Sequence, residues 1–450
     1  MKRREFLRSA GFLAAGAALG ACTSKSNESG QTGKTPGPMT LRTNPNTGDK
    51  VSVLGYGCMR LPQTGEGKDA PLDHEEIARH VDYALEHGIN YFDTSPAYCR
   101  GQSEDAIGRA LSRHPRESYF IATKLSNFAP EQQSAEASQK MFFDSLKHLR
   151  TDYIDYYLLH VMGRDGMDGA NARFFDNGMV DFLMEQKKAG KIRNLGFSYH
   201  GDVNTFDEML RRHDAGLLHW DFIQIQLNYY NWEHPAEEGG PTAKYLYDEL
   251  AKRDIPVVIM EPLLGGTLAK LPQPIVTKLK GRRPQDSAAS WAFRFAAQPA
   301  VLTVLSGMTY MDNIRENIAT FSPHEPVTED ERALLMRVAT ELSENDSVPC
   351  TGCAYCMPCP YGVDIPGVFA HYNRCVAEDL VRHDTRDPDF DTARRAYLRG
   401  LGQAVSPLRQ ADMCVGCGAC RSHCPQTIDI PAQLARIDRY TESLRTAESS

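Results

Sequence analysis

The chain has 450 residues, of which 41% are hydrophobic and 24% are charged, proportions that are ordinary for a soluble globular protein. Its formal net charge of -8 at pH 7 argues against a general nucleic-acid binder, because such proteins need a basic surface. The length accommodates about three domains, or one large barrel with an accessory unit.

The N-terminus has the features of an export signal. Residues 1–8 (M-K-R-R-E-F-L-R) are basic, and the apolar stretch 11–21 that follows is too short to span a bilayer. The arginine pair followed by F-L resembles a twin-arginine signal, and L-G-A-C resembles a lipoprotein cleavage box. We therefore expect residues 1–22 to be a signal peptide and lipidated Cys22 to tether the mature protein to the periplasmic face of a membrane. A soluble N-terminal helix and a cytoplasmic protein form the alternative. Residues 23–38, rich in Ser, Gly, Thr and Pro, predict a flexible linker.

Between residues 51 and 310, short apolar runs alternate with helical patterns. The runs show little polar alternation, as expected of parallel strands buried on both faces. They are Val51–Gly57, Ile89–Asp93, Tyr119–Lys124, Ile154–His160, Ile192–Ser198, Phe222–Asn228, Pro256–Glu261 and Val301–Ser306. Helical periodicity lies between them, for example at Asp73–His87 and Gln139–Leu149. This alternation predicts an α/β fold, a (β/α)8 TIM barrel. A doubly wound open sheet is the alternative, although no Gly-x-Gly-x-x-Gly follows a strand.

Polar residues lie at the carboxyl ends of several runs, where barrel enzymes place catalytic groups. These residues are Asp93, Tyr98, Lys124 and His160. A tyrosine, with a pKa of about 10, is a poor acid at neutral pH unless its anion is stabilised. We expect the ammonium of Lys124 to lower the pKa of Tyr98, and Asp93 to keep Lys124 charged and in place. His160 would donate a hydrogen bond that polarises a carbonyl substrate.

These residues lie within a series of motifs that resembles the aldo-keto reductases. The motifs are F-D-T-S-P-A-Y, S-E-D-A-I-G-R-A-L, I-A-T-K, D-Y-Y-L-L-H, G-K-I-R-N-L-G-F-S, Q-I-Q-L-N-Y and R-E-N. The resemblance covers roughly residues 39–325. It implies NAD(P)-dependent reduction of a small carbonyl or oxidation of an alcohol, with Tyr98 as general acid/base. The substrate stays open, because the loops that select it vary freely on this barrel.

The resemblance also implies a nicotinamide nucleotide extended across the barrel mouth. By position, Ser198 and Gln224 would hold the carboxamide, and residues 260–263 would line the nicotinamide and pyrophosphate. The complete implied set is Ser198, Gln224, Met260, Pro262, Leu263, Ser306, Gly307, Glu316 and Asn317, the last four at the adenosine end.

Some positions depart from the family pattern. Tyr199 replaces a common Asn, and Met260 replaces a common aromatic ring. Gly307 and Asn313 stand where many members present cations to the 2′-phosphate, which weakens a preference for NADPH. Arg315 is a candidate substitute. On family grounds NADP(H) is favoured, with NAD(H) as the alternative.

Residues 326–346 predict a connecting helix, with Thr328 as N-cap and Glu331 at the capping-box position. Beyond it, eight of the twelve cysteines form two runs, each followed by proline. The first run is Cys350, Cys353, Cys356 and Cys359, and the second is Cys414, Cys417, Cys420 and Cys424. The second run has the C-x2-C-x2-C-x3-C-P spacing of bacterial ferredoxins, and the first is one residue shorter before its last cysteine. The remaining Cys58 and Cys375 are expected to be packing residues, and Cys99 a loop residue.

In a ferredoxin, the fourth cysteine of each run binds the other cluster. The pattern therefore predicts two 4Fe-4S clusters, one on Cys350, Cys353, Cys356 and Cys424, the other on Cys414, Cys417, Cys420 and Cys359. The shortened first run leaves a single cluster as an alternative. Zinc knuckles or disulfides are less consistent with three successive gaps of two residues.

The long gap between the runs predicts a helical module. Helical patterns near Pro366–Leu380 and Thr392–Gly402 indicate an α-helical ferredoxin-type domain over residues 347–440, followed by a tail, 441–450. The repeated endings Y-G-V-D-I-P and Q-T-I-D-I-P indicate an internal duplication, each copy beginning a helix with proline in its first turn.

Together these patterns predict an exported oxidoreductase whose clusters pass single electrons to or from an electron-transfer partner. Twin-arginine substrates leave the cytoplasm folded and with cofactors loaded, which would protect the thiols in an oxidising compartment. The alternative is an exported binding or scaffold protein with a silent barrel and structural clusters.

Overall fold

The structure is a computed structural model that describes residues 37–65, 70–236, 240–343, 347–385, 387–426 and 428–447. The expected signal peptide, Cys22 and nearly all of the expected linker lie outside these residues. Within the described ranges, no helix combines the length and apolar character needed to cross a membrane.

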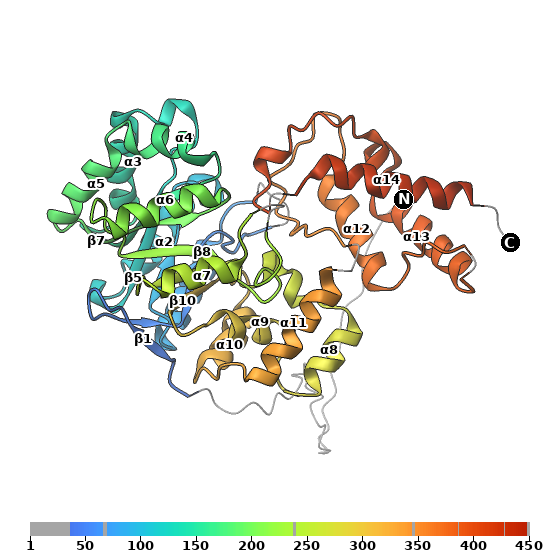
Figure 1. Ribbon diagram of the computed structural model, residues 1–450, viewed down its shortest axis with the longest axis horizontal. Helices are drawn as coiled ribbons and strands as arrows, with labels where there is room; N and C mark the ends of the chain where they lie inside the picture. The colour runs from blue at the N-terminus through green and yellow to red at the C-terminus, as the bar shows by residue number, and fades with distance from the viewer. Residues whose placement is uncertain are drawn as a thin grey trace, which may run out of the picture. The chain divides into compact units, whose positions relative to one another are not determined.

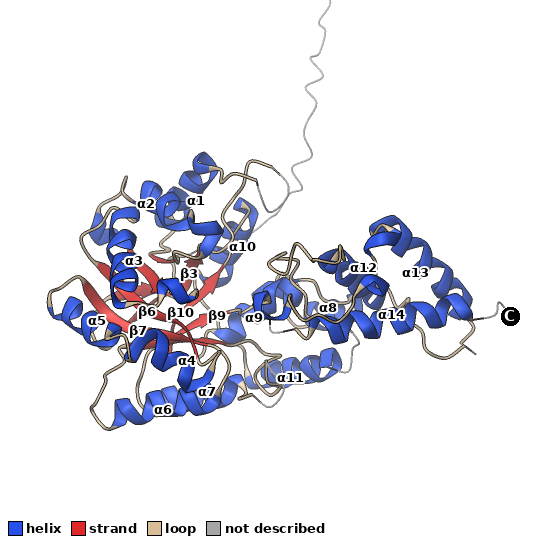
Figure 2. Ribbon diagram, turned by 90° about the horizontal axis from the view of Figure 1, so that it is seen from above, coloured by secondary structure: helices blue, strands red, loops and turns tan. Residues whose placement is uncertain are grey.

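Eight parallel strands close into a barrel in the order β10-β3-β4-β5-β6-β7-β8-β9, which confirms the TIM barrel and excludes the open sheet. Figure 2 shows these strands in red with helices outside them. The barrel strands are β3 (Leu54–Gly57), β4 (Tyr91–Asp93), β5 (Phe120–Leu125), β6 (Ile154–Met162), β7 (Ile192–Tyr199), β8 (Phe222–Gln226), β9 (Val257–Met260) and β10 (Val301–Ser306).

Helices follow the strands, and capping side chains fix where the two examples singled out above begin. Asp73 accepts a hydrogen bond from the Glu76 backbone and starts α1 as expected. Ser134 accepts from the Ala137 backbone, so α3 begins earlier than the periodicity indicated. The helices in this part are α1 (His74–Glu86), α2 (Ser103–Leu111), α3 (Ala135–His148), α4 (Gly166–Ala170), α5 (Met179–Lys188), α6 (Val203–Asp214), α7 (Ala243–Ala251), α8 (Gln273–Lys280), α9 (Ala288–Ala296), α10 (Met311–Phe321) and α11 (Glu329–Ser343).

The first apolar run is divided, contrary to its prediction as one strand. Strand β2 (Lys50–Ser52) pairs antiparallel with β1 (Leu41–Thr43), and only β3 joins the barrel. Between β1 and β2, Asn44 donates its Nδ2 hydrogen to the Tyr156 hydroxyl at 3.0 Å. The Tyr156 ring packs 4.9 Å from that of Tyr91, so the hairpin is joined to the aromatic interior of the barrel.

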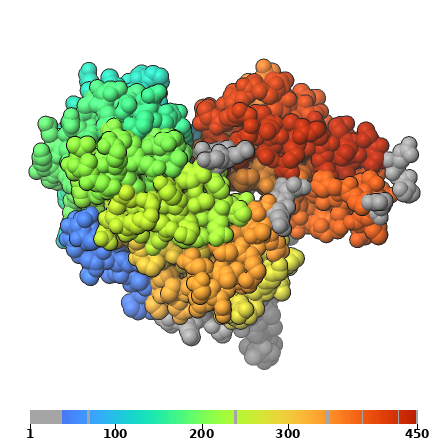
Figure 3. Space-filling view, in the orientation of Figure 1, coloured from blue at the N-terminus to red at the C-terminus, as the bar shows by residue number. Residues whose placement is uncertain are grey.

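The C-terminal module consists of α12 (Ile365–Ala377), α13 (Phe390–Ala404) and α14 (Ile430–Thr446), drawn in orange to red in Figure 1. Their buried side chains form a hydrophobic core separate from the core of the barrel. In the space-filling view, the orange-to-red atoms of this module form one continuous surface (Figure 3). Helix α14 continues to Thr446 and buries Leu444, so it extends past residue 440, where the domain was expected to end.

Side-chain caps explain how the connecting helix and the repeated module helices begin. The Thr328 backbone donates to Glu331 Oε2 at 2.8 Å, while the Glu331 backbone donates to Thr328 Oγ1 at 3.3 Å, which is the predicted capping box of α11. Asp364 and Asp429 cap α12 and α14 in one direction only, by accepting from the Gly367 and Ala432 backbones, and each helix has proline in its first turn.

Candidate active site and cluster cavities

A buried ion pair lies at the carboxyl ends of β4 and β5. Lys124 Nζ donates to Asp93 Oδ1 at 2.6 Å and to the Thr94 carbonyl at 2.8 Å. The two side chains are 1% and 4% exposed. The pairing of β4 with β5 places them side by side, and Gln224 of β8 donates to the second Asp93 oxygen at 3.3 Å. Both charges of the pair are therefore compensated inside the barrel mouth.

Tyr98 lies just beyond β4, with its ring centroid 4.8 Å from the Lys124 ammonium. Cys99 and Arg100, which follow it, have positive φ angles of 48° and 55°, a region that side chains other than glycine rarely adopt. This turn belongs to a short 3-10 segment, Tyr98–Gly101. The backbone therefore adopts an unusual conformation directly after the residue expected to transfer the proton.

The expected direction of the Tyr98 pKa is wrong. Burial raises the pKa of Tyr98 well above its ordinary value, and the nearby Asp93 carboxylate raises it further. The Lys124 ammonium already bonds to Asp93 and Thr94, which explains why it does not produce the expected decrease. Tyr98 consequently keeps its proton at neutral pH, the state that a proton donor requires.

His160 at the mouth of β6 is a neutral imidazole. Burial lowers the pKa of His160 well below its ordinary value, and the Lys124 ammonium lowers it further. Ser126 Oγ lies 2.6 Å from His160 Nδ1, and a proton donated by Ser126 would leave the ring proton on Nε2. The rings of His160 and Tyr98 meet edge to face at 5.9 Å. Sequence reasoning missed Ser126, although its place two residues beyond Lys124 marks it as a strand-mouth residue.

A cavity of about 190 Å³, which we call the catalytic groove, lies beside Tyr98 and Asp93. It brings together most of the implied nucleotide residues, namely Gln224, Met260, Pro262, Leu263, Ser306 and Gly307. Lys124 and His160 do not line the groove. Ser198 does not line it either, because its side chain is buried and its Oγ accepts from the Val161 backbone at 2.9 Å.

The implied adenine residues, Glu316 and Asn317, do not line the groove. Asn317 is buried and donates its Nδ2 hydrogen to Ser306 Oγ at 3.0 Å, while exposed Glu316 accepts from the Ser287 hydroxyl. Arg315, the candidate 2′-phosphate partner, instead donates to Asp312 at 3.1 Å. Asn317 therefore holds the Ser306 hydroxyl by this hydrogen bond and does not itself face the groove.

Arg60 is a groove residue that sequence reasoning missed. A Cβ added to Gly307 would lie 3.9 Å from the Arg60 Cβ, so this cation flanks the expected adenosine end. Its position just after β3, in G-C-M-R, was the available signal. A cation at this place can bind a phosphate group.

The cysteine runs assemble into two separate four-thiol cavities. The first cluster cavity is lined by Cys350, Cys353, Cys356 and Cys424. The second cluster cavity is lined by Cys359, Cys414, Cys417 and Cys420. Each cavity thus combines three cysteines of one run with the fourth of the other, as the ferredoxin rule predicted. No disulfide joins cysteines among the described residues.

The donor sets fit iron–sulfur clusters. Within the described ranges, no three His, Cys, Asp or Glu side chains converge closely enough for a single metal ion, whereas four thiols surround each cavity. Burial raises the pKa of Cys356 to about 12, and the neighbouring Cys350 and Cys353 raise it further. Four crowded sulfurs in an apolar enclosure therefore require a cationic centre to become thiolates.

The first cysteine run contacts the barrel mouth. Arg60 Nη2 donates to Thr351 Oγ1 at 3.2 Å. A Cβ added to Gly265 would lie only 1.7 Å from Thr351 Cγ2, so glycine is needed there for close approach. The Tyr355 phenol of the same run also contributes to the raised pKa of Tyr98. The catalytic groove and the first cluster cavity therefore lie next to each other, because Gly265 lines the groove and Thr351 lines the cluster cavity.

Comparisons with known proteins agree with this division. Residues 53–338 match the family model described as "Aldo/keto reductase family", and residues 349–428 match "4Fe-4S dicluster domain". L-galactose dehydrogenase of Arabidopsis thaliana is 26% identical over 314 residues, covering 65% of this chain and 92% of that protein. NADH-specific methylglyoxal reductase of Escherichia coli (strain K12) is 26% identical over 327 residues, covering 65% and 96%. The holo form of an aldo-keto reductase from Bacillus halodurans superposes with a TM-score of 0.53 at 25% identity, covering 67% of this chain and 96% of that chain.

Proposed function

This chain belongs to the aldo/keto reductase family and carries a 4Fe-4S domain, and from this premise we propose that its barrel reduces a small carbonyl compound with Tyr98 as proton donor. The family membership makes the protein an NAD(P)-dependent oxidoreductase. The reverse reaction, oxidation of the corresponding alcohol, uses the same residues.

The observation that carries the proposal is the buried Lys124–Asp93 pair, whose ammonium lies 4.8 Å from the Tyr98 ring centroid. In carbonyl reduction, Tyr98 gives its proton to the substrate oxygen, and the nearby ammonium stabilises the resulting phenolate. Neutral His160 donates a hydrogen bond to the same oxygen and polarises the carbonyl. Replacing Tyr98 by Phe tests this assignment, and unchanged carbonyl reductase activity would contradict it.

We assign the nicotinamide nucleotide to the catalytic groove. When bound there, the nucleotide supplies or accepts the hydride. Gln224 already donates to Asp93, so its amide is held in place at the groove wall, while Met260 supplies a polarizable surface for a ring. NADP(H) remains the favoured nucleotide on family grounds, with Arg60 as a phosphate partner, and NAD(H) is the alternative. Denaturing the purified protein and identifying the released nucleotide tests this choice, and NAD alone would contradict NADP.

The two clusters are proposed to transfer single electrons to or from a partner. Support comes from the paired four-thiol cavities and the contact of the first run with the barrel mouth. Anaerobic purification, iron and sulfide analysis and reductive titration followed by electron paramagnetic resonance test it. Clusters that cannot be reduced reversibly, together with absent turnover, would favour the scaffold alternative.

Export is proposed from the sequence of residues 1–22 alone. The mature protein would begin at lipidated Cys22 and face the periplasm. Cell fractionation of the full chain, with Cys22→Ala as the comparison, checks this. An unprocessed protein in the cytoplasm would contradict it.

A further inference from the structure

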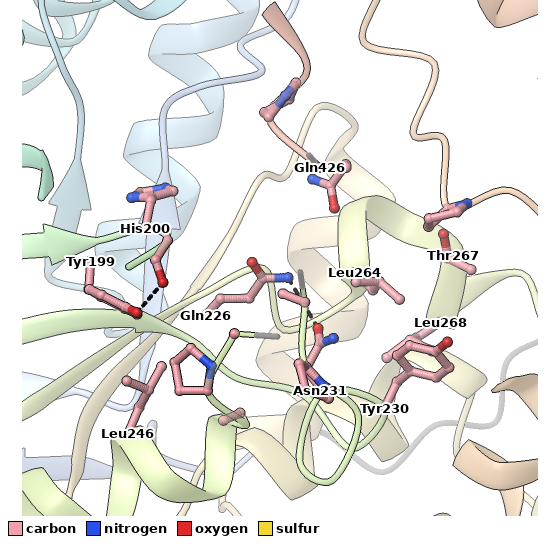
Figure 4. A pocket seen from close by; sticks show the side chains of 18 of the residues that line it. Tyr199, His200, Gln226, Tyr230, Asn231, Leu246, Leu264, Thr267, Leu268 and Gln426 are labelled. Carbon is pink, nitrogen blue, oxygen red and sulfur yellow. Dashed lines mark hydrogen bonds between the residues drawn. The ribbon is translucent and has the colours of Figure 1, made fainter. Parts of the chain in front are cut away.

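A second large cavity lies at the contact of the barrel with the cluster module. This cavity, of about 200 Å³, is here called the junction cavity. On the barrel side it is lined by Gln226, Tyr230 and Asn231, and on the module side by Pro425 and Gln426. Figure 4 shows Gln426 on one side of the space and Gln226 and Asn231 on the other. At this volume it is large enough for a small aromatic ring, since a cavity of about 150 Å³ can hold benzene.

The junction cavity shares a wall with each of the two redox sites. Gln426 lines both the junction cavity and the first cluster cavity, and it lies two residues after the cluster ligand Cys424. Next to Gln426, the segment Leu264–Ala269 contributes Leu264 to the junction cavity, while the adjacent Gly265 lines the catalytic groove. A Cβ added to Gly265 would lie 3.6 Å from the Gln426 side chain, so a ligand here would lie beside both the hydride site and the first cluster.

The described part of the lining is unfavourable for an anionic ligand. Among the described residues of the wall, none is Asp, Glu, Lys or Arg. Burial lowers the pKa of His200, also in the wall, to about 3, so this ring is neutral as well. A phosphate or carboxylate would lose its hydration here without gaining a partner of opposite charge, which is unfavourable.

The wall nevertheless presents polar groups for a neutral ligand. Within the described part of the chain, the side chains of Tyr230, Thr267 and Gln426 make no hydrogen bond. Gln226 donates to Asn231 at 3.1 Å, which leaves the carbonyl oxygen of Gln226 as an acceptor. Hydroxyl and amide donors on both sides of an apolar space suit a flat ring with oxygens at opposite ends.

From this arrangement we propose that the junction cavity binds a neutral quinone-class ring that exchanges electrons with the first cluster. The proposal rests on the two-cluster function stated above and adds the class of the electron-transfer substrate. In the exchange, a quinone gains two electrons in single steps, one from each reduced cluster, and two protons from water, and becomes a hydroquinone. Each cluster is oxidised by one electron. A quinone suits this place because it accepts electrons singly, as clusters deliver them.

Binding is tested on the intact cluster-loaded protein by equilibrium dialysis with a water-soluble dimethoxy-methyl-benzoquinone. We expect saturable binding at one site, and weaker binding of a sulfonated anthraquinone because of its charge. Thr267→Phe should fill the cavity and weaken binding at least about tenfold, a cost of roughly 1.4 kcal/mol. Thr277→Phe on exposed α8 is the matched control and should bind as the parent does.

Electron exchange is tested separately by reducing the clusters with dithionite and following their reoxidation by the same benzoquinone. Saturation in the parent and in Thr277→Phe, with loss of saturation in Thr267→Phe and Gln426→Leu, would support the proposal. Absent binding, stronger binding of the sulfonated ring, or equal rates in all variants would overturn it. Because dialysis does not depend on turnover, a protein that lacks carbonyl reductase activity but binds the quinone would contradict only the proposed barrel function.

Discussion

The Lys124 ammonium lies 4.8 Å from the centroid of the Tyr98 ring, yet its hydrogen bonds go to Asp93 and Thr94. Lys124 therefore acts on Tyr98 as a fixed positive charge near the ring, while its own hydrogen bonds go to other groups. In the resting protein, burial is the largest influence on the pKa of Tyr98 and raises it, so Tyr98 stays protonated. The ammonium becomes important when the proton leaves, because it then faces a phenolate.

Tyr98→Phe should lower the turnover of carbonyl reduction by about 10²–10⁴-fold, since it removes the proton donor and leaves the ring. Steady-state kinetics with a reactive small aldehyde and a nicotinamide nucleotide would measure this. Tyr91→Phe is the matched control, because Tyr91 is a buried tyrosine of the same region whose hydroxyl has no partner among the described residues. Similar activity losses in the two variants would contradict a chemical role for Tyr98.

The direction of the Tyr98 pKa predicts opposite pH profiles for the two reaction directions. Carbonyl reduction needs the protonated phenol, so its kcat/KM should stay level from about pH 7 to about pH 10. Alcohol oxidation needs the phenolate and should rise with pH across the same range. A reduction rate that falls between about pH 7 and about pH 8 would show that the free protein holds Tyr98 at a lowered pKa.

Lys124→Met should destabilise the barrel by about 3–5 kcal/mol, because it leaves the Asp93 carboxylate buried without its partner. The double variant Lys124→Met with Asp93→Asn should recover part of this loss, since neither charge is then buried. Thermal unfolding of the barrel followed by circular dichroism would compare them. A double variant less stable than the single one would show that the pair is not coupled.

The crossed thiol sets predict which cysteine losses act together. Cys424→Ser should remove the first cluster, decreasing iron from about eight to about four atoms per chain. Adding Cys350→Ser should cost no further iron, because both thiols line the same cavity, although they belong to different runs. Adding Cys420→Ser instead should remove the second cluster as well. Equal iron contents in the two double variants would contradict the crossed arrangement.

The barrel could be predicted from sequence because buried parallel strands are continuous apolar runs, and a closed barrel places their carboxyl ends together. The same continuity concealed the division of the first run, because Val51–Gly57 is apolar on both sides of the point where β2 ends. The assignment of Asp93 and Lys124 to one place followed from strand order. The pKa of Tyr98 did not, because it depends on burial and on which partner Lys124 binds.

The cluster cavities could likewise be predicted from cysteine spacing, which fixes local geometry independently of the surrounding fold. Contacts between the module and the barrel could not. Thr351 and Gly265 are far apart in sequence, and no local pattern marks their approach. The burial of Ser198 and Asn317 could not be predicted for the same reason. Sequence position indicates the strand or helix of a residue, but packing decides which of its atoms a ligand can contact.

The approach of Thr351 to Gly265 has a mechanical consequence. Gly265 lines the catalytic groove, and Thr351 follows directly after Cys350, a proposed ligand of the first cluster. A displacement of this loop by an entering nucleotide would push on the segment that carries the first thiol. Nucleotide binding in the groove would then change the position of the first cluster, because the Gly265–Thr351 contact has room for a hydrogen atom but not for a methyl group.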